Sequence, residues 1–178
     1  NSSNDESLFL VRRKDFFMGQ WIKRSSGYPT WFPRLFKNGE VLVEREINEE
    51  YVTKGKKGML KEHLLHYPFK KGIDWWFNRH NKYSSMEAVS LTNEFQNSIP
   101  WRYAFSNDAT LKRKFQKQLF YRMPYRPVVM FVLLYIVRCG FLDGKAGYAF
   151  CKLRYIYESM ISLKMQEIKF NINSKNES

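Results

Sequence analysis

The chain has 178 residues, of which 44% are hydrophobic, and this is enough to fill the core of one folded domain with or without an appendage. With 30 Lys and Arg against 17 Asp and Glu the formal charge is +13, which predicts an anionic partner such as phosphate, nucleic acid or an acidic membrane leaflet. The two cysteines, Cys139 and Cys151, have neither CxxC nor metal-knuckle spacing, which argues against a disulfide framework and favours a reducing compartment.

The first half of the chain has the pattern of β-structure. Residues 8 to 11 form a short apolar run that predicts a strand, and a basic and aromatic connector follows it. The dipeptide Asn38-Gly39 favours a hairpin turn, so we predict a β-hairpin over residues 34 to 47. The segment MLKEHLLHY predicts another strand, which ends at His66.

The second half has helical spacing. Apolar residues from Ile73 onward predict a helix with Asp74 near its start. The apolar run 128 to 137 is about half as long as a membrane-spanning helix, so we expect it to lie on a membrane surface or to pack in a helical core. After it we predict a glycine-punctuated loop over 140 to 150, a final helix that ends at Phe170, and a disordered tail.

Most common catalytic motifs are absent from the sequence, which has no Walker loop, GxGxxG, HExxH or GxSxG motif and no Asp-x-Asp pair. One acidic cluster lies beside Trp31 and Arg34 across the predicted hairpin, and it consists of Glu44, Glu46, Glu49 and Glu50. An Arg on such a strand can hold a phosphate, and a Glu at its end can act as a general base. By spacing alone the cluster is more typical of a solvated face, and a lone His66 is more typical of a hydrogen-bonded structural residue.

Six segments follow one another in an ordered series along the chain. They are RRKDFFMGQWI, YPTWFPRLFKNGEV, EREINEEY, LLHYPF, WFNRHNKYSSMEA and GFLDGKAGY. This series, from about Phe9 to about Tyr155, resembles the C-terminal half of family 2 glycosyltransferases of bacterial cell-envelope polysaccharide synthesis. Such enzymes add sugars to lipopolysaccharide core, capsule or exopolysaccharide.

The resemblance implies an α/β fold class: the C-terminal portion of a GT-A, Rossmann-like glycosyltransferase, followed by an amphipathic helical region. We therefore expect residues 1–98 to belong to the acceptor side of the catalytic domain, 99–170 to be helical and membrane-associating, and 171–178 to be a disordered tail. The nucleotide-binding half, with its Asp-x-Asp, would lie before the part present here. The N-terminus lacks Met and the features of a signal peptide, which agrees with a chain cut from something longer.

The resemblance also implies roles for individual residues. Glu49 is the candidate base that activates the acceptor hydroxyl, and Trp31 and Arg34 are candidate contacts to the acceptor or the diphosphate. Asn48 is a candidate substrate-binding residue, but it stands where the family commonly has His, so the metal or phosphate role of that His is not carried over to it. His66 matches a strand-ending His that contacts the metal or the diphosphate. The full enzyme would use a nucleotide-sugar donor and a divalent cation, Mg or Mn.

The expected function is an inverting transfer of a sugar to a lipid- or polysaccharide-linked acceptor at the cytoplasmic face of the inner membrane. The basic helical region would then lie against an anionic leaflet, and no nucleic acid would be a partner. Two alternatives remain from composition: a basic, aromatic module that binds nucleic acid, and a membrane-surface adaptor without catalysis.

Overall fold

The computed structural model describes residues 6–43, 51–94, 100–123 and 125–176. It is a mixed α/β structure, in agreement with the predicted class, and it divides into two compact units. The first unit contains Asn1–Ile73 with Leu134–Cys151, and the second contains Asp74–Leu133 with Lys152–Ser178. The predicted boundary between 98 and 99 lies outside the described residues and stays a prediction.

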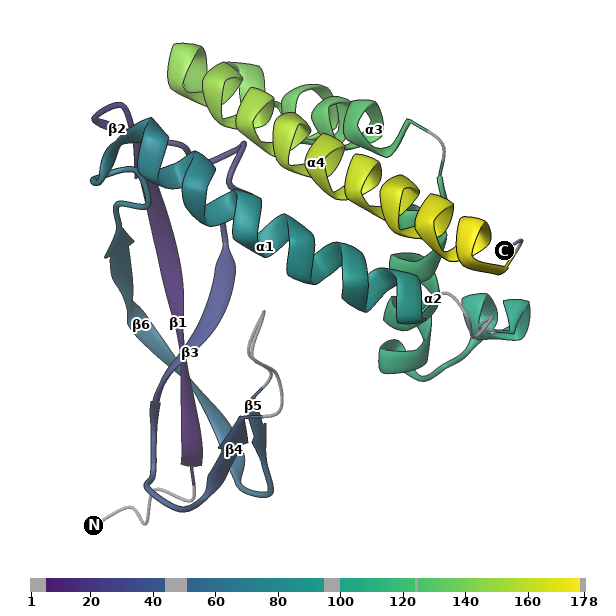
Figure 1. The fold of residues 1–178 in the computed structure, drawn as a ribbon. Coiled ribbons are helices and arrows are strands. Elements are labelled where there is room, and N and C mark those ends of the chain that lie inside the picture. The colour runs from purple at the N-terminus through teal and green to yellow at the C-terminus, as the bar shows by residue number, and fades with distance from the viewer. Residues whose placement is uncertain (1–5, 44–50, 95–99, 124, 177–178) are drawn as a thin grey trace, which may run out of the picture. The chain divides into compact units, whose positions relative to one another are not determined.

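The first unit is built on the long strand β1 (Glu6–Phe17), which includes the predicted strand at 8 to 11. It pairs antiparallel with β3 (Thr30–Phe36) and parallel with β6 (Lys56–His66), which ends at His66 as predicted (Figure 1). Antiparallel β2 (Gln20–Trp21) pairs with the end of β1. A two-residue turn joins them, in which Met18 and Gly19 have φ values of 50° and 74°; two successive positive φ values match the right-handed twist of a hairpin.

The predicted hairpin over 34 to 47 is wrong in its strand pairing. Strands do flank Asn38-Gly39, and Gly39 has the positive φ of 79° that such a turn requires. Among the described residues, however, β3 pairs with β1, whereas β4 (Val41–Val43) pairs antiparallel with β5 (Tyr51–Thr53) in a separate two-stranded sheet. Residues 44 to 47 of the predicted hairpin lie outside the described residues.

Side chains of β1 alternate between two faces of the sheet. Val11, Asp15 and Phe17 are buried on one face, whereas Arg12 and Lys14 point to the other and are partly exposed. The register between β1 and β3 shifts where Phe9 pairs with Leu35 and Leu10 with Pro33, so one extra residue of β3, Arg34, forms a bulge.

The second unit consists of helices. α1 (Gly72–Glu94) has Asp74 in its first turn, as predicted, and is followed by η1 (Trp101–Phe105), α2 (Ala109–Arg122) and α3 (Arg126–Val132). α1 and α4 (Gly144–Asn176) lie side by side (Figure 1) and share an apolar core of Ala88, Leu91, Ile161 and Met165. Helix α4 continues past Phe170 to Asn176, so it takes in most of the segment that was expected to be a disordered tail.

Polar contacts inside this unit fix the helices more specifically than the apolar core does. Lys164 of α4 places its amino group 2.6 Å from the carbonyl oxygen of Asn81 and 2.8 Å from each of two serine hydroxyls on α1. Buried Arg126 lies 3.0 Å from the carboxylate of Glu158. Burial raises the pKa of Glu158, and the guanidinium groups of Arg154 and Arg126 oppose this rise.

The predicted loop over 140 to 150 is wrong. The apolar run continues α3 into the π-helical turn η2 (Leu133–Val137), a short 3-10 helix η3 (Gly140–Asp143) follows, and α4 begins at Gly144. A side-chain carbon at Gly140 would lie 2.5 Å from the carbonyl oxygen of Leu134, and one at Gly147 would collide with the carbonyl oxygen of Gly140. The glycines therefore allow close packing of backbone on backbone instead of marking a loop.

Within the described part of the chain, no single helix is long and apolar enough to cross a membrane. The helices Arg126–Val137 and Gly140–Ser174 meet that requirement of length and composition only when they are taken together as a bent pair.

Cys151 gives a direct probe of the first unit. Its side chain is fully buried, and burial, with a smaller contribution from Asp143, raises the pKa of the thiol to about 11. Because the thiolate is the reactive form, we expect iodoacetamide at about pH 8 to modify Cys151 at least about 100-fold more slowly in the folded protein than in concentrated urea. Mass spectrometry of the alkylated peptides measures both rates, and partly exposed Cys139 serves as the internal comparison. Equal rates at Cys151 in the folded and unfolded states would contradict the packing of this helix.

Candidate functional site at the carboxyl ends of two parallel strands

A short polar contact joins the carboxyl ends of β1 and β6. Asp15 and His66 are register partners there, and His66 Nδ1 lies 2.6 Å from Asp15 Oδ1. Asp15 is buried, whereas the side chain of His66 is 40% exposed. Ligands of open α/β sheets bind beyond the carboxyl ends of parallel strands, so this pair lies where such a site is expected.

A third side chain completes this cluster. Arg13 Nε lies 3.0 Å from Asp15 Oδ1, and its guanidinium carbon lies 4.0 Å from the centre of the Phe32 ring. The carboxylate of Asp15 thus holds both a guanidinium group and an imidazole. Because Nδ1 of His66 is engaged with Asp15, the ring is oriented, and Nε2 is the nitrogen through which it would contact a ligand, either as a metal ligand or as a donor to an anion.

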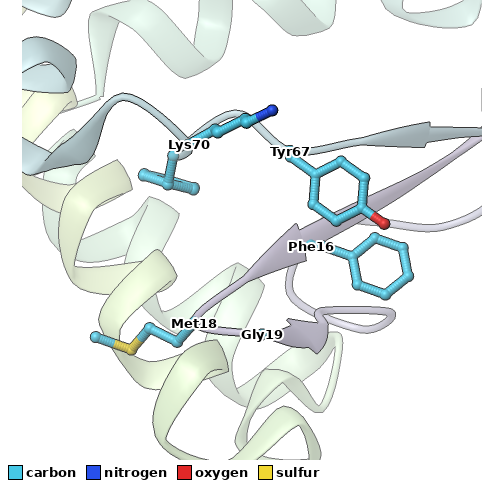
Figure 2. Close-up of a pocket in the computed structure, with 6 residues that line it drawn as sticks. Phe16, Met18, Gly19, Tyr67 and Lys70 are labelled. Atoms are coloured by element: carbon cyan, nitrogen blue, oxygen red, sulfur yellow. The ribbon is translucent and has the colours of Figure 1, made fainter.

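A pocket of about 490 Å³ opens immediately after these two residues in both strands. Figure 2 shows it between the turn that follows β1 and the segment that follows β6. Its lining consists of Phe16, Met18, Gly19, Tyr67, Phe69 and Lys70. The rings of Phe16 and Tyr67 are stacked with their centres 5.1 Å apart, so the walls are aromatic, and Lys70 adds a cation to the lining. This combination suits the apolar face of a sugar, or another ring, that carries a negatively charged substituent.

The opposite face from Asp15 carries alternating cations and aromatic rings, and we call it the cation–aromatic face. Its members are Arg12, Lys14, Trp21, Tyr28, Trp31 and His63. Arg12 lies over the ring of Trp31 at 5.4 Å, and Lys14 lies over the ring of Trp21 at 4.8 Å. The hydroxyl of Tyr28 is 2.8 Å from His63 Nε2. Loss of hydration, and then the charges of Lys14 and Arg12, lower the pKa of His63, so this face disfavours a further positive charge and favours an anion.

The structure distributes the predicted site residues over the sheet. Trp31 belongs to the cation–aromatic face, and exposed Arg34 forms the bulge of β3, where its Nη1 donates to the carbonyl oxygen of Pro33 at 3.1 Å. His66 lies on the other face with Asp15, so Trp31 and His66 are not brought together. Asn48 and Glu49 lie outside the described residues, and so do the other members of the acidic cluster.

No group of three or more His, Cys, Asp or Glu side chains that could hold a metal occurs among the described residues. The divalent cation expected from the resemblance stays a prediction.

Asp15 and Arg13 were missed by the sequence analysis, although a signal for Asp15 exists. It is the one acidic residue between Glu6 and Glu40, and it follows three consecutive cations in a segment that alternates like a strand. A carboxylate on the core-facing side of a strand has to be paired with a cation or a hydrogen-bond donor, because an unpaired buried charge is costly. No comparable signal points to His66 as its partner, because the register of parallel strands is not encoded locally.

Comparisons of the chain with models of known protein families, with curated protein sequences and with solved structures give no significant match.

Proposed function

We propose that the chain is the C-terminal, acceptor-side part of a membrane-associated glycosyltransferase similar to family 2 enzymes of bacterial cell-envelope polysaccharide synthesis. In this proposal the nucleotide-binding, Rossmann-like half of a GT-A enzyme is supplied by sequence outside these residues. The product is a glycosylated lipid- or polysaccharide-linked acceptor, made at the cytoplasmic face of the inner membrane. The ordered series of six motifs is the reason for choosing this family.

The observation that carries the proposal is the pairing of His66 with Asp15. The family resemblance assigns a diphosphate or metal contact to a strand-ending His, and His66 ends β6 with Nδ1 bound to a buried carboxylate. The side chain of His66 is 40% exposed, so a ligand can reach the ring from solvent. The aromatic pocket that is lined by the next residues along each strand has the size of a small-molecule site.

The chemistry follows from these groups. Glu49 takes the proton of an acceptor hydroxyl, whose oxygen attacks the anomeric carbon of the donor while the nucleoside diphosphate departs on the opposite side, so the configuration inverts. His66 and nearby cations stabilise the negative charge of the leaving diphosphate. Mg or Mn would add to that stabilisation when bound, and the resemblance assigns its Asp-x-Asp site to the nucleotide-binding half.

The test is release of nucleoside diphosphate from a panel of nucleotide sugars by the full gene product that carries these residues, with native membranes as the acceptor source. We expect Glu49→Gln to lower turnover by about 100-fold or more, because a positioned base contributes that much. We expect His66→Gln to lower turnover by about tenfold or more, since it removes one stabilising contact to the diphosphate.

Glu62→Gln is the matched control, because it removes the same charge from an exposed position of β6 and should leave turnover within about twofold. A Glu49→Gln enzyme with wild-type turnover would remove Glu49 from the role of base. Absence of any nucleoside diphosphate release from every donor would reject the proposed function as a whole.

Single-stranded nucleic acid is a second candidate partner because the cation–aromatic face interleaves charge with rings. Its own Arg12 and Lys14 lie over Trp31 and Trp21, however, and cover ring faces that bases would have to stack on. Fluorescence anisotropy of a labelled oligonucleotide tests this candidate, which requires an affinity that falls steeply with salt. A protein that binds anionic vesicles but neither releases nucleoside diphosphate nor binds oligonucleotide would favour the non-catalytic adaptor.

A further inference from the structure

A sharp turn between two helical segments projects apolar side chains into solvent, and we call residues 136–142 the elbow. It contains the end of η2, two linking residues and most of η3. Its large exposed side chains are Ile136, Val137, Phe141 and Leu142. Contiguous exposed apolar side chains of this size are rare on soluble surfaces unless another molecule covers them.

Internal contacts of the first unit hold the elbow in place. Oδ2 of buried Asp143, at its end, accepts hydrogen bonds from Arg24 N at 2.8 Å, Ser25 N at 2.7 Å and Ser25 Oγ at 2.7 Å. The missing side chain of Gly140 allows its backbone to lie against that of Leu134, and Arg138 packs against Gly27. The exposed apolar residues are thus presented on a braced turn.

The charges around the elbow have one sign at the surface. Exposed cations come from the loop that Asp143 binds, from the elbow and from the first turn of α4, and they are Lys23, Arg24, Arg138 and Lys145. Asp143 is the only acidic residue in segments 20–28 and 134–151, and it is buried. An apolar tip ringed by cations matches the acyl and headgroup layers of an anionic bilayer, whereas a second copy of the same surface would be repelled.

Aromatic side chains lie at the base of the elbow. The ring of Tyr135 is 6.2 Å from that of Phe141 and 5.7 Å from that of Tyr148, and these contacts form an aromatic group beside the apolar tip. Tyrosine favours the boundary between water and acyl chains because its ring is apolar and its hydroxyl is polar.

We propose that the elbow is a monotopic membrane-insertion element, in which Ile136, Val137, Phe141 and Leu142 enter the interfacial layer of an anionic bilayer and the surrounding cations bind its headgroups. This inference shares the anionic leaflet with the proposed function, but it does not require sugar transfer. It narrows the expected membrane-associating region, residues 99–170, to one short, braced turn.

The test is flotation of the 178-residue chain with vesicles of phosphatidylcholine containing about 30% phosphatidylglycerol, against phosphatidylcholine alone. Phe141→Ser with Leu142→Ser is expected to weaken binding by about tenfold or more, because apolar burial in the bilayer is lost. Arg138→Gln with Lys145→Gln is expected to weaken binding to the anionic vesicles by about tenfold, and to change binding to neutral vesicles little.

The chain offers a closely matched control on strand β3. Leu35 and Phe36 are adjacent, have the same side chains as Leu142 and Phe141, and are 57% and 52% exposed against 61% and 48%. Leu35→Ser with Phe36→Ser should leave flotation within about twofold of wild type. Far-UV circular dichroism and protection of Cys151 from alkylation confirm that each variant is folded.

Equal losses in the two apolar double variants, or no loss at the elbow, would overturn the proposal. A change of oligomeric state on sedimentation with unchanged flotation would also overturn it, because the elbow would then be a contact between copies. If the elbow serine variant fails to fold, the double variant Arg138→Gln with Lys145→Gln still tests the proposal, because both side chains are exposed and their replacement should not unfold the protein. No nucleotide sugar is present in this experiment, so its failure is separate from failure of the transferase proposal.

Discussion

Replacing Asp143 with alanine is expected to lower the free energy of unfolding of the first unit by about 4 kcal/mol. Three donors share one oxygen of this carboxylate, and both Asp143 and Ser25 are almost fully buried. A hydrogen bond to a charged group contributes about 1.5 to 3 kcal/mol, but bonds that share an acceptor are not additive, which keeps the estimate below their sum. Alanine would leave the Ser25 amide and hydroxyl buried without this acceptor, and that desolvation accounts for much of the loss.

The measurement is pulsed alkylation of Cys151 across a urea series, because this thiol belongs to the same unit and becomes reactive when the unit opens. Ser25→Ala should cost about 1 to 2 kcal/mol, since it removes one of the three bonds, and Asp143→Asn should fall between the two because the amide keeps an acceptor oxygen. Glu62→Ala removes an exposed carboxylate on β6 and should change the free energy of unfolding by less than about 0.5 kcal/mol. If Asp143→Ala and Glu62→Ala unfold at the same urea concentration, the hydrogen bonds of Asp143 do not hold the elbow.

Periodicity found the elements whose side-chain pattern is decided locally. The strand at residues 8 to 11, the strand that ends at His66, the helix from Ile73 and the final helix are all present. Periodicity failed where the outcome depends on a distant partner. Asn38-Gly39 does turn the chain, but β1 takes β3 as its neighbour and leaves β4 to pair with β5, a choice that residues 34 to 47 alone do not determine.

The candidate site shows the same division. His66 could be selected from its place at the end of an apolar strand. Its partner Asp15, which precedes it by 51 residues and lies 2.6 Å away, could not be predicted from that place. Trp31 and Arg34 were selected as one group, yet a one-residue bulge at Arg34 and the alternation of β3 give them different surroundings. Asn48 and Glu49 lie outside the described residues, so their proposed roles stay predictions.

The glycines of residues 140 to 150 led to the prediction of a loop where the chain is helical. Gly147 lies inside α4, where exchange of Gly for Ala ordinarily stabilises a helix by about 1 kcal/mol. Here the new carbon would collide with the carbonyl oxygen of Gly140 and would lie 2.6 Å from Asp143 Cβ. We therefore expect Gly147→Ala to have the opposite sign and to destabilise the first unit by about 2 to 3 kcal/mol, because backbone has to move to make room.

The same alkylation of Cys151 measures this change, and two other glycines separate its causes. Gly39→Ala should cost only about 1 kcal/mol, because its φ of 79° strains an L residue but nothing lies within 4 Å of the added carbon. Gly140→Ala should destabilise like Gly147→Ala, since its added carbon would lie 2.5 Å from the carbonyl oxygen of Leu134. If Gly147→Ala instead stabilises the unit by about 1 kcal/mol, as an ordinary helix position would, then Gly140 and Gly147 are not in contact.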